Sequence, residues 1–223
     1  MAVIHHTTLS PTKLELLADW LPSRPWYRGG AGGPQLTKAG GFRLDDPEGE
    51  VGIEFMVVTD TGGDAPVTYQ VPLTYRGTAP AGAEDGLVGT LVHGTLGRRW
   101  VYDGAHDPVL VEQLLALLAG HTAAQAQSES DTPDPTVEVR AGQRGVPAPP
   151  AGPGKVSDTA DATVIGVGAA GEPGPLHDLT LTRVLRPGPT TADGVRGQVL
   201  ARWTAPDGSE ERGVFAFLSD PGR

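Results

Sequence analysis

The chain has no cysteine among its 223 residues, which excludes disulfide bonds and any chemistry that depends on a thiolate. It also has no apolar run near the roughly 18 residues that a membrane-spanning helix needs. The first residues, MAVIHHTTLSP, lack the charged and apolar regions of a secretory signal peptide. We therefore expect a soluble protein of the cytoplasm.

Positive charge is in short supply. Lys and Arg number 17 against 27 Asp and Glu, giving a formal net charge of −10, and no run of five basic residues occurs. Binding to nucleic acid depends on neutralising phosphates, so this composition argues against it. The chain instead has 32 Gly and 21 Pro, clustered between regular apolar patterns. Such punctuation favours a folded, β-rich protein with long turns.

Two helices are predicted. Residues 10–21 carry one apolar stripe, with Ser10 as N-cap, Pro11 as first residue and Pro22 as the stop signal. The second helix begins with Asp107 as N-cap and Pro108 as first residue, and continues through VLVEQLLALLAG. Its apolar stripe is so broad that it indicates either burial on two sides or a docking surface.

Strands with a period of two follow the first helix. Pro72 removes a ladder donor, which predicts an edge strand or a neighbouring bulge for its segment. We expect the strands of this half to form an antiparallel meander, with helix 10–21 on its apolar face. The predicted segments are Phe42–Leu44, Val51–Val58, Val67–Arg76, 87–94 and 97–104.

The second half predicts a smaller sheet that would struggle to bury enough surface alone. Its strands are expected at Ala162–Val167, Leu179–Leu185, Val195–Trp203 and Gly213–Leu218. The fold class is therefore α+β, with a curved antiparallel sheet and packed helices followed by a second small antiparallel sheet. The predicted organisation is a domain over 1–127, a polar and Gly/Pro-rich linker over 128–160, and a small β subdomain over 161–223.

The sequence shows no GxSxG, HExxH or P-loop motif, so we predict no catalytic, cofactor-binding or metal-binding residues and no cofactor. Asp103, His106 and Asp107 crowd the start of the second helix. The simpler interpretation is that Asp107 caps the helix and Asp103 fixes the preceding turn.

The aromatic residues leave two alternatives open. Core packing accounts for most of them, whereas the functional alternative is a surface that stacks on a sugar or binds a partner. The candidate interaction surface comprises Trp20, Trp26, Tyr27, Arg28, Arg99, Trp100, Tyr102, Asp103, His106 and Asp107.

Three phrases taken in order resemble a known family. LELLADWLPSRPWYRG, YQVPLTYRG and GRRWVYDGAHDPVLVEQLL are similar to the N-terminal cap of bacterial maltokinases, over roughly residues 1–127. The resemblance implies a curved antiparallel sheet with a helix against it, described for that family as cystatin-like.

A weaker resemblance covers the second half, where KVSDTADATVIGV and LTLTRVLRPGP are similar to the small-lobe sheet of those kinases. Thr180 stands where the family pattern has a nucleotide-contacting Lys, and the loop before Thr163 lacks the family's Glu-Gln-Ser-Asn character. The sequence also ends at Arg223, before any large lobe with its catalytic Asp and metal ligands. The resemblance therefore implies a degenerate kinase small lobe, and we expect no enzyme activity.

Two functional hypotheses follow. The first is a non-catalytic accessory, regulatory or scaffold protein in α-glucan and trehalose metabolism, with a glucan- or trehalose-pathway enzyme or a kinase as its partner. The alternative is a small-molecule binder that holds a sugar or an apolar ligand in the concavity of the sheet. A Gly-rich loop near Trp26 would then act as a lid.

Overall fold

A large antiparallel sheet runs through the computed structural model, which describes residues 8–81, 83–129, 131–142, 153–168, 177–188 and 194–221. Its strands are β1 (Leu9–Ser10), β2 (Leu36–Leu44), β3 (Gly52–Asp60), β4 (Val67–Arg76), β5 (Leu87–His93), β6 (Gly97–Asp103), β7 (Gln125–Ala126), β8 (Glu138–Ala141), β9 (Pro153–Asp158), β10 (Ala162–Val167), β11 (His177–Thr182), β12 (Val195–Thr204) and β13 (Glu210–Ser219). The main order is β1-β5-β6-β4-β3-β2-β12-β13-β11-β10-β9. With few helices beside an open sheet, the fold is α+β, as the sequence predicts.

The strands of the first half do not form the predicted meander. β2, β3 and β4 are joined as successive hairpins, but β6 rather than β5 lies beside β4, and β5 lies outside it. The connection 77–86, which includes the short 3-10 helix η2 (Glu84–Gly86), is longer than a tight turn. It therefore allows the chain to pass over one strand position before it returns.

Pro72 also lies elsewhere than predicted, because β4 is an interior strand and pairs with β3 without a bulge. The opposite side of β4 is divided between two partners. Its first part bonds to the segment after β11, with Gln70 N donating to Arg183 O at 2.9 Å, whereas β6 begins to pair at Leu73. Alternate residues direct their N–H groups to the same side, so Pro72 faces the break between these partners. Its missing donor falls where no ladder bond is required.

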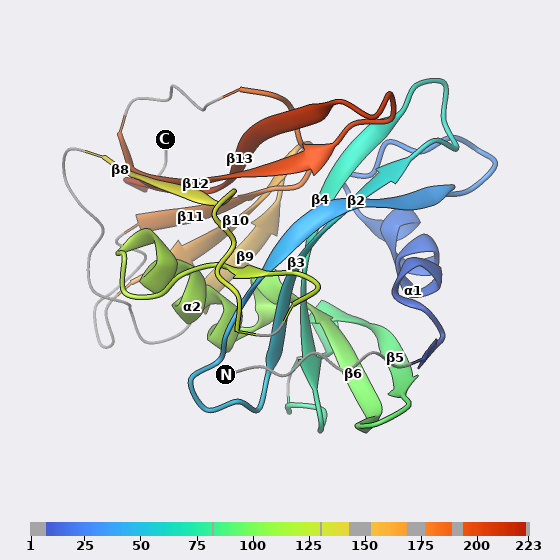
Figure 1. The fold of residues 1–223 in the computed structure, drawn as a ribbon, viewed down its shortest axis with the longest axis horizontal. Coiled ribbons are helices and arrows are strands. Elements are labelled where there is room, and N and C mark those ends of the chain that lie inside the picture. Colours follow the sequence, from blue (N-terminus) through green and yellow to red (C-terminus); the bar gives the residue numbers. More distant parts are fainter. Residues whose placement is uncertain are drawn as a thin grey trace.

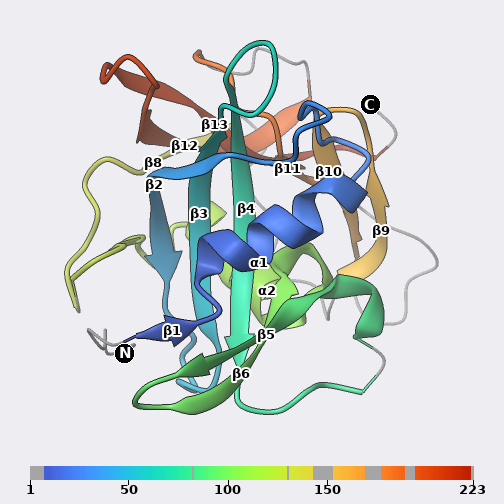
Figure 2. The same ribbon diagram turned by 90° about the vertical axis from the view of Figure 1, so that its right-hand side faces the viewer.

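The first helix, α1 (Lys13–Trp20), begins later than predicted. Thr12 rather than Ser10 is the N-cap, because Thr12 and Glu15 form a capping box. The chain continues into the 3-10 helix η1 (Leu21–Ser23). α1 lies across β3 and β4, as Figure 2 shows, where Leu17 and Trp20 pack into a core with Met56.

The second helix, α2 (Pro108–Leu118), begins as predicted, with Asp107 as N-cap and Pro108 as first residue. It follows the 3-10 helix η3 (Gly104–His106). Seven of its residues are buried, and its leucines share one core with β2, β3 and strands β10 to β13. Figure 1 shows α2 beneath the strands of the second half, on the opposite side of β3 from α1. The broad apolar stripe therefore reflects burial on two sides.

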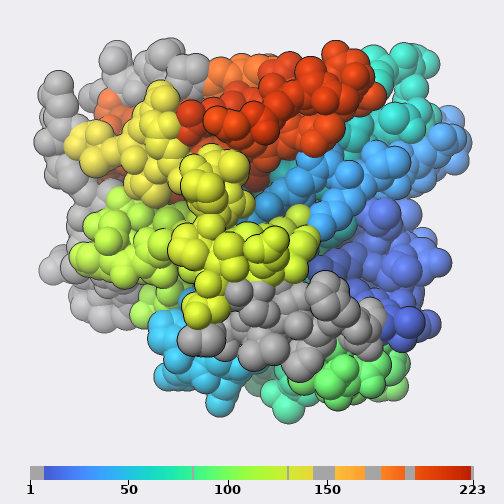
Figure 3. Space-filling view, viewed as in Figure 1, coloured from blue at the N-terminus to red at the C-terminus, as the bar shows by residue number. Residues whose placement is uncertain are grey.

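The two halves share backbone bonds as well as a core. Trp203 of β12 pairs with Gly40 of β2, and an isolated bridge joins Tyr69 to Val184. Residues 128–160, for which we expected a linker, contain the strands β8 and β9. β7 pairs with β2 and β8 pairs with β12, so the yellow segment in Figure 3 lies between the blue strand and the red strands.

In the part of the chain that the structure describes, no helix has the length and apolarity needed to cross a membrane.

Candidate functional site

The aromatic residues at the end of α1 form an internal cluster. The ring centroids of Trp20 and Trp26 are 5.8 Å apart, and the Tyr69 ring is 5.8 Å from both Trp26 and Tyr27. Trp20 and Trp26 are buried, and Tyr27 is half-buried. Burial and the hydrogen bond to Asp60 raise the pKa of Tyr27, whose hydroxyl donates to that carboxylate at 2.9 Å. The two tryptophans are therefore core residues and present no open stacking face.

Asp103 belongs to a buried ion pair that joins the two halves. The Nη2 atom of Arg183 donates to its two carboxylate oxygens at 2.7 and 2.6 Å, and Nε of Arg183 donates to Thr163 Oγ1 at 2.7 Å. The Arg183 side chain is 0% exposed, and its guanidinium carbon lies 5.1 Å from the centroid of Trp26. Asp103 also accepts from the Ala105 N–H at 3.2 Å, which confirms the predicted turn role.

Arg183 was not among the candidate residues predicted from the sequence. One signal was present, because a lone arginine in the run LTLTRVL follows a strand whose neighbours are apolar or uncharged. Arginine is almost never fully buried without a partner, so such a position implies a carboxylate nearby. The sequence does not say which one.

Asp107 combines its cap with a second contact. Its Oδ1 accepts from the Val109 N–H at 3.0 Å, and both carboxylate oxygens accept from Arg76 at 2.7 Å. The Thr74 hydroxyl also donates to it, at 2.7 Å. His106 is half-buried near Gly86. In the described ranges, no three His, Asp or Glu side chains are placed to hold a metal ion.

The hairpin of β5 and β6 carries three further candidates, Arg99, Trp100 and Tyr102. Val92 pairs with Arg98 and Thr90 pairs with Trp100, so these four side chains share one face, together with Tyr102 further along β6. Arg99 lies on the opposite face. Trp100 is half-buried and Tyr102 is buried. The large hydrophobic residues exposed in the described part of the molecule all lie on this hairpin: Leu87 at 40%, Val92 at 54% and Leu96 at 45%.

Arg28 lies at the junction of the halves, away from the hairpin. Its backbone N–H donates to the Tyr69 hydroxyl at 2.8 Å, and its side chain forms an ion pair with Asp161. Arg186 approaches the other oxygen of Asp161, at 3.6 Å. Both arginines line a pocket of about 350 Å³ at the start of β4.

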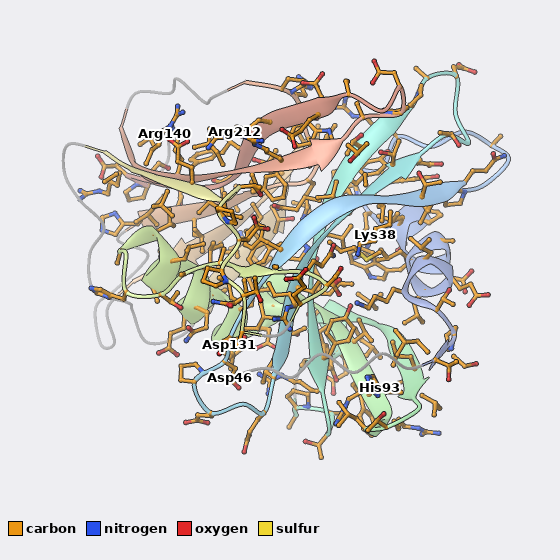
Figure 4. All side chains as sticks on the ribbon, in the orientation of Figure 1. Lys38, Asp46, His93, Asp131, Arg140 and Arg212 are labelled. Carbon is orange, nitrogen blue, oxygen red and sulfur yellow. The ribbon has the colours of Figure 1, made fainter. Side chains whose placement is uncertain are left out.

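A second acid between two arginines lies on the outer surface, where Glu138 forms ion pairs with Arg140 and Arg212. Figure 4 shows both arginines beside strands β8 and β13. These contacts fasten the short strand β8 to its neighbours.

The comparison with protein families bears on one part of the chain. The family model for the maltokinase N-terminal cap domain matches residues 20–107. This segment resembles a maltokinase cap. The comparison with curated proteins found no match.

The cap match runs from the end of α1 to the N-cap of α2 and includes strands β2 to β6. All ten residues of the candidate interaction surface fall inside the matched segment. Arg183 and Arg186 fall outside it, so the buried ion pair and the junction pocket each combine cap residues with residues of the second half.

Proposed function

We propose that this chain is a non-catalytic accessory or scaffold protein related to the maltokinase cap, acting in α-glucan or trehalose metabolism through protein–protein contacts. The observation that carries the proposal is the outward face of the β5–β6 hairpin. In this proposal the cap is cystatin-like and the second half is a degenerate kinase small lobe, which binds no cofactor.

The composition of the hairpin face supports a protein partner. Tryptophan and arginine are enriched at interfaces, and Trp100 here lies beside Arg98 and the exposed Val92. Elsewhere, the faces of the cap sheet are occupied by the chain itself. α1 covers one face, and α2 with the second half covers much of the other. Among the described residues, the hairpin is therefore the part of the matched segment that offers large exposed apolar side chains to another molecule.

The non-catalytic part of the proposal rests on the second half. Thr180, in β11, supplies a hydroxyl where the family pattern has an amine, so it carries no charge for a phosphate. Thr163 is buried, and its hydroxyl is engaged within the chain: it donates to Asp158 at 2.5 Å and accepts from Arg183 at 2.7 Å. Both residues serve the packing of the sheet.

The alternative, a small-molecule binder, is favoured by a different observation. The side chains of α1 and α2 fill the faces of the cap sheet, which removes the support for a ligand in its concavity. The junction pocket of about 350 Å³ lies within the size range of small-ligand sites.

Affinity capture with the whole chain tests the main proposal. The immobilised protein is exposed to extract from cells that make α-glucan and trehalose, and bound proteins are identified by mass spectrometry. We expect stoichiometric recovery of a glucan- or trehalose-pathway enzyme or of a kinase.

Two variants locate the contact. Val92→Lys places a charge on the exposed hairpin face and should abolish recovery, whereas Thr204→Lys, exposed on β12, should leave it unchanged. Failure to recover any such enzyme, or equal recovery by both variants, would overturn the proposal.

A further inference from the structure

The junction pocket is built by four separate segments, one of which is the loop after η1 that carries Arg28. The start of β4 contributes Pro66 and Val67, the segment after β11 contributes Leu185 and Arg186, and the end of the β12–β13 hairpin contributes Trp203 and Glu211. Figure 1 shows the start of β4 beside this hairpin, at the opposite end of β4 from β6. The pocket is thus distinct from the proposed docking face and exists only where the two halves meet.

Hydrogen-bond donors line one part of the pocket. Arg28 and Arg186 both belong to the lining, and both approach the same carboxylate, that of Asp161. A guanidinium group has five N–H donors, so one carboxylate leaves most of them available to a ligand. The Arg186 side chain is 65% exposed, and its contact with Asp161, at 3.6 Å, is longer than a hydrogen bond. Asp161 therefore holds the two guanidinium groups close together and leaves most of their N–H donors available to a ligand.

An acceptor and apolar walls complete the lining. Glu211 brings a carboxylate, and Pro66, Val67 and Trp203 supply apolar surface. The charges decide what kind of ligand fits. The lining holds Arg28, Arg186 and Glu211, and Asp161 lies against both arginines, so these four side chains together carry no net charge. A phosphate or carboxylate would meet a neutral site in a chain of net charge −10, whereas a neutral ligand would meet both donors and an acceptor.

We propose that this pocket binds a small neutral polyhydroxylated ligand of mono- or disaccharide size. Hydroxyl groups donate to Glu211 and accept from Arg28 and Arg186, and the carbon face of the ligand packs on the apolar wall. At about 350 Å³ the pocket lies at the small end of the usual range for ligand sites. The proposal gives the small-molecule alternative a site and a ligand class, and it does not depend on the docking face.

Thermal unfolding of the full chain with glucose, maltose and glucose 6-phosphate as probes tests the proposal. At a hundredfold excess over Kd, a neutral sugar should raise Tm by roughly 5–11 °C. Glucose 6-phosphate should give a smaller rise in Tm at equal concentration, because Asp161 and Glu211 already balance the positive charges of Arg28 and Arg186. Isothermal titration then supplies the Kd of the better neutral sugar.

Matched pairs of variants assign the binding to this pocket. Glu211→Gln and Arg186→Gln should each weaken binding about tenfold or more, since each removes a charge-assisted hydrogen bond. Glu210→Gln and Arg202→Gln are the controls, because that exposed pair lies outside the pocket lining, and they should change Kd less than twofold. A Tm without ligand close to wild type shows that each variant is folded, and the high exposure of Arg186 makes its variant the safer one.

Three results would overturn the proposal. The first is no rise in Tm with either neutral sugar up to about 100 mM, a Kd that corresponds to a binding free energy of only about −1.4 kcal/mol. The others are equal binding by the pocket and control variants, or tighter binding of glucose 6-phosphate than of the neutral sugars. None of them touches the affinity-capture experiment, so the docking proposal and the pocket proposal fail separately.

Discussion

Replacing Arg183 by methionine removes the charge that ties the second half to the segment matching the maltokinase cap, and it leaves an unbranched side chain in place. Arg183 is fully buried and bonds to both oxygens of Asp103 at 2.7 and 2.6 Å. In the variant, the Asp103 side chain stays buried without its cationic partner and keeps only the Ala105 N–H among the bonds described for it. An uncompensated buried carboxylate is therefore the main consequence of the change.

The magnitude follows from that burial. Breaking a buried ion pair by removing one partner costs about 3–5 kcal/mol of unfolding free energy. For a chain of this size each kcal/mol shifts Tm by about 2–4 °C, so Arg183→Met should lower Tm by roughly 6–20 °C. Because the halves share a core as well as this pair, we expect the whole molecule to unfold in one transition at the lower temperature.

Urea and thermal unfolding of four variants test the reasoning. Asp103→Asn should cost about as much as Arg183→Met, whereas the double variant should cost clearly less than the sum, since no charge is then left unpaired. Arg202→Met breaks an exposed pair with Glu210 and should cost less than about 1 kcal/mol. A loss for Arg183→Met no larger than that for Arg202→Met would refute a stabilising role for the buried pair.

Three further predictions concern stability. Burial raises the pKa of Glu54, but the charge of Lys13 and the hydrogen bonds of Glu54 outweigh it, so the pKa is lowered on folding. The stabilisation that ionised Glu54 gives the folded state is present above the pKa of Glu in the unfolded chain, near 4.3, and is lost as pH falls through the folded-state pKa. The Tm of Glu54→Gln should therefore approach that of wild type toward pH 3. A constant difference in Tm from pH 3 to 7 would contradict this. Gly41→Ala should cost at least about 2 kcal/mol in urea unfolding, because φ is +130° and a Cβ would lie 2.2 Å from Phe55 O; Gly32→Ala, with open space at its Cβ, is the control, and equal losses would count against the argument. Asp107→Ala should cost about 2–4 kcal/mol, since it removes both the cap of α2 and the partner of Arg76, and Asp107→Asn, which can still cap, should cost less; the reverse order in urea midpoints would disprove it.

Local patterns in the sequence were enough to predict most elements. β10 lies at Ala162–Val167, as expected, and Asp107 with Pro108 gave the correct start of α2, because caps and alternation are properties of neighbouring residues. The same kind of local evidence gave a wrong prediction for the start of α1. The Thr12–Glu15 capping box was present in the sequence, but Ser10 and Pro11 offered a competing signal.

For the candidate interaction surface, local patterns did not predict which residues are buried or which distant residues pair. The sequence marked Trp26 and Trp100 as aromatic residues with two possible roles, and only the tertiary structure buried the first and left the second half-exposed. The pairing of Asp103 with Arg183, 80 positions later, cannot be predicted from nearby residues. The local sequence around each of them would be equally compatible with any other partner of opposite charge.

By itself, then, the sequence determined the helices, most of the strands, the α+β class and the resemblance to the maltokinase cap, since each depends on the order of nearby residues. Only the tertiary structure decided that β6 rather than β5 lies beside β4, that Pro72 faces a break between two partners, and that the halves meet around a buried ion pair and a pocket. Strand order depends on the path that the long connections take between strands. Contacts between distant side chains depend on which faces of the sheet and helices pack against one another. Those are choices of the whole chain, and no short stretch of it encodes them.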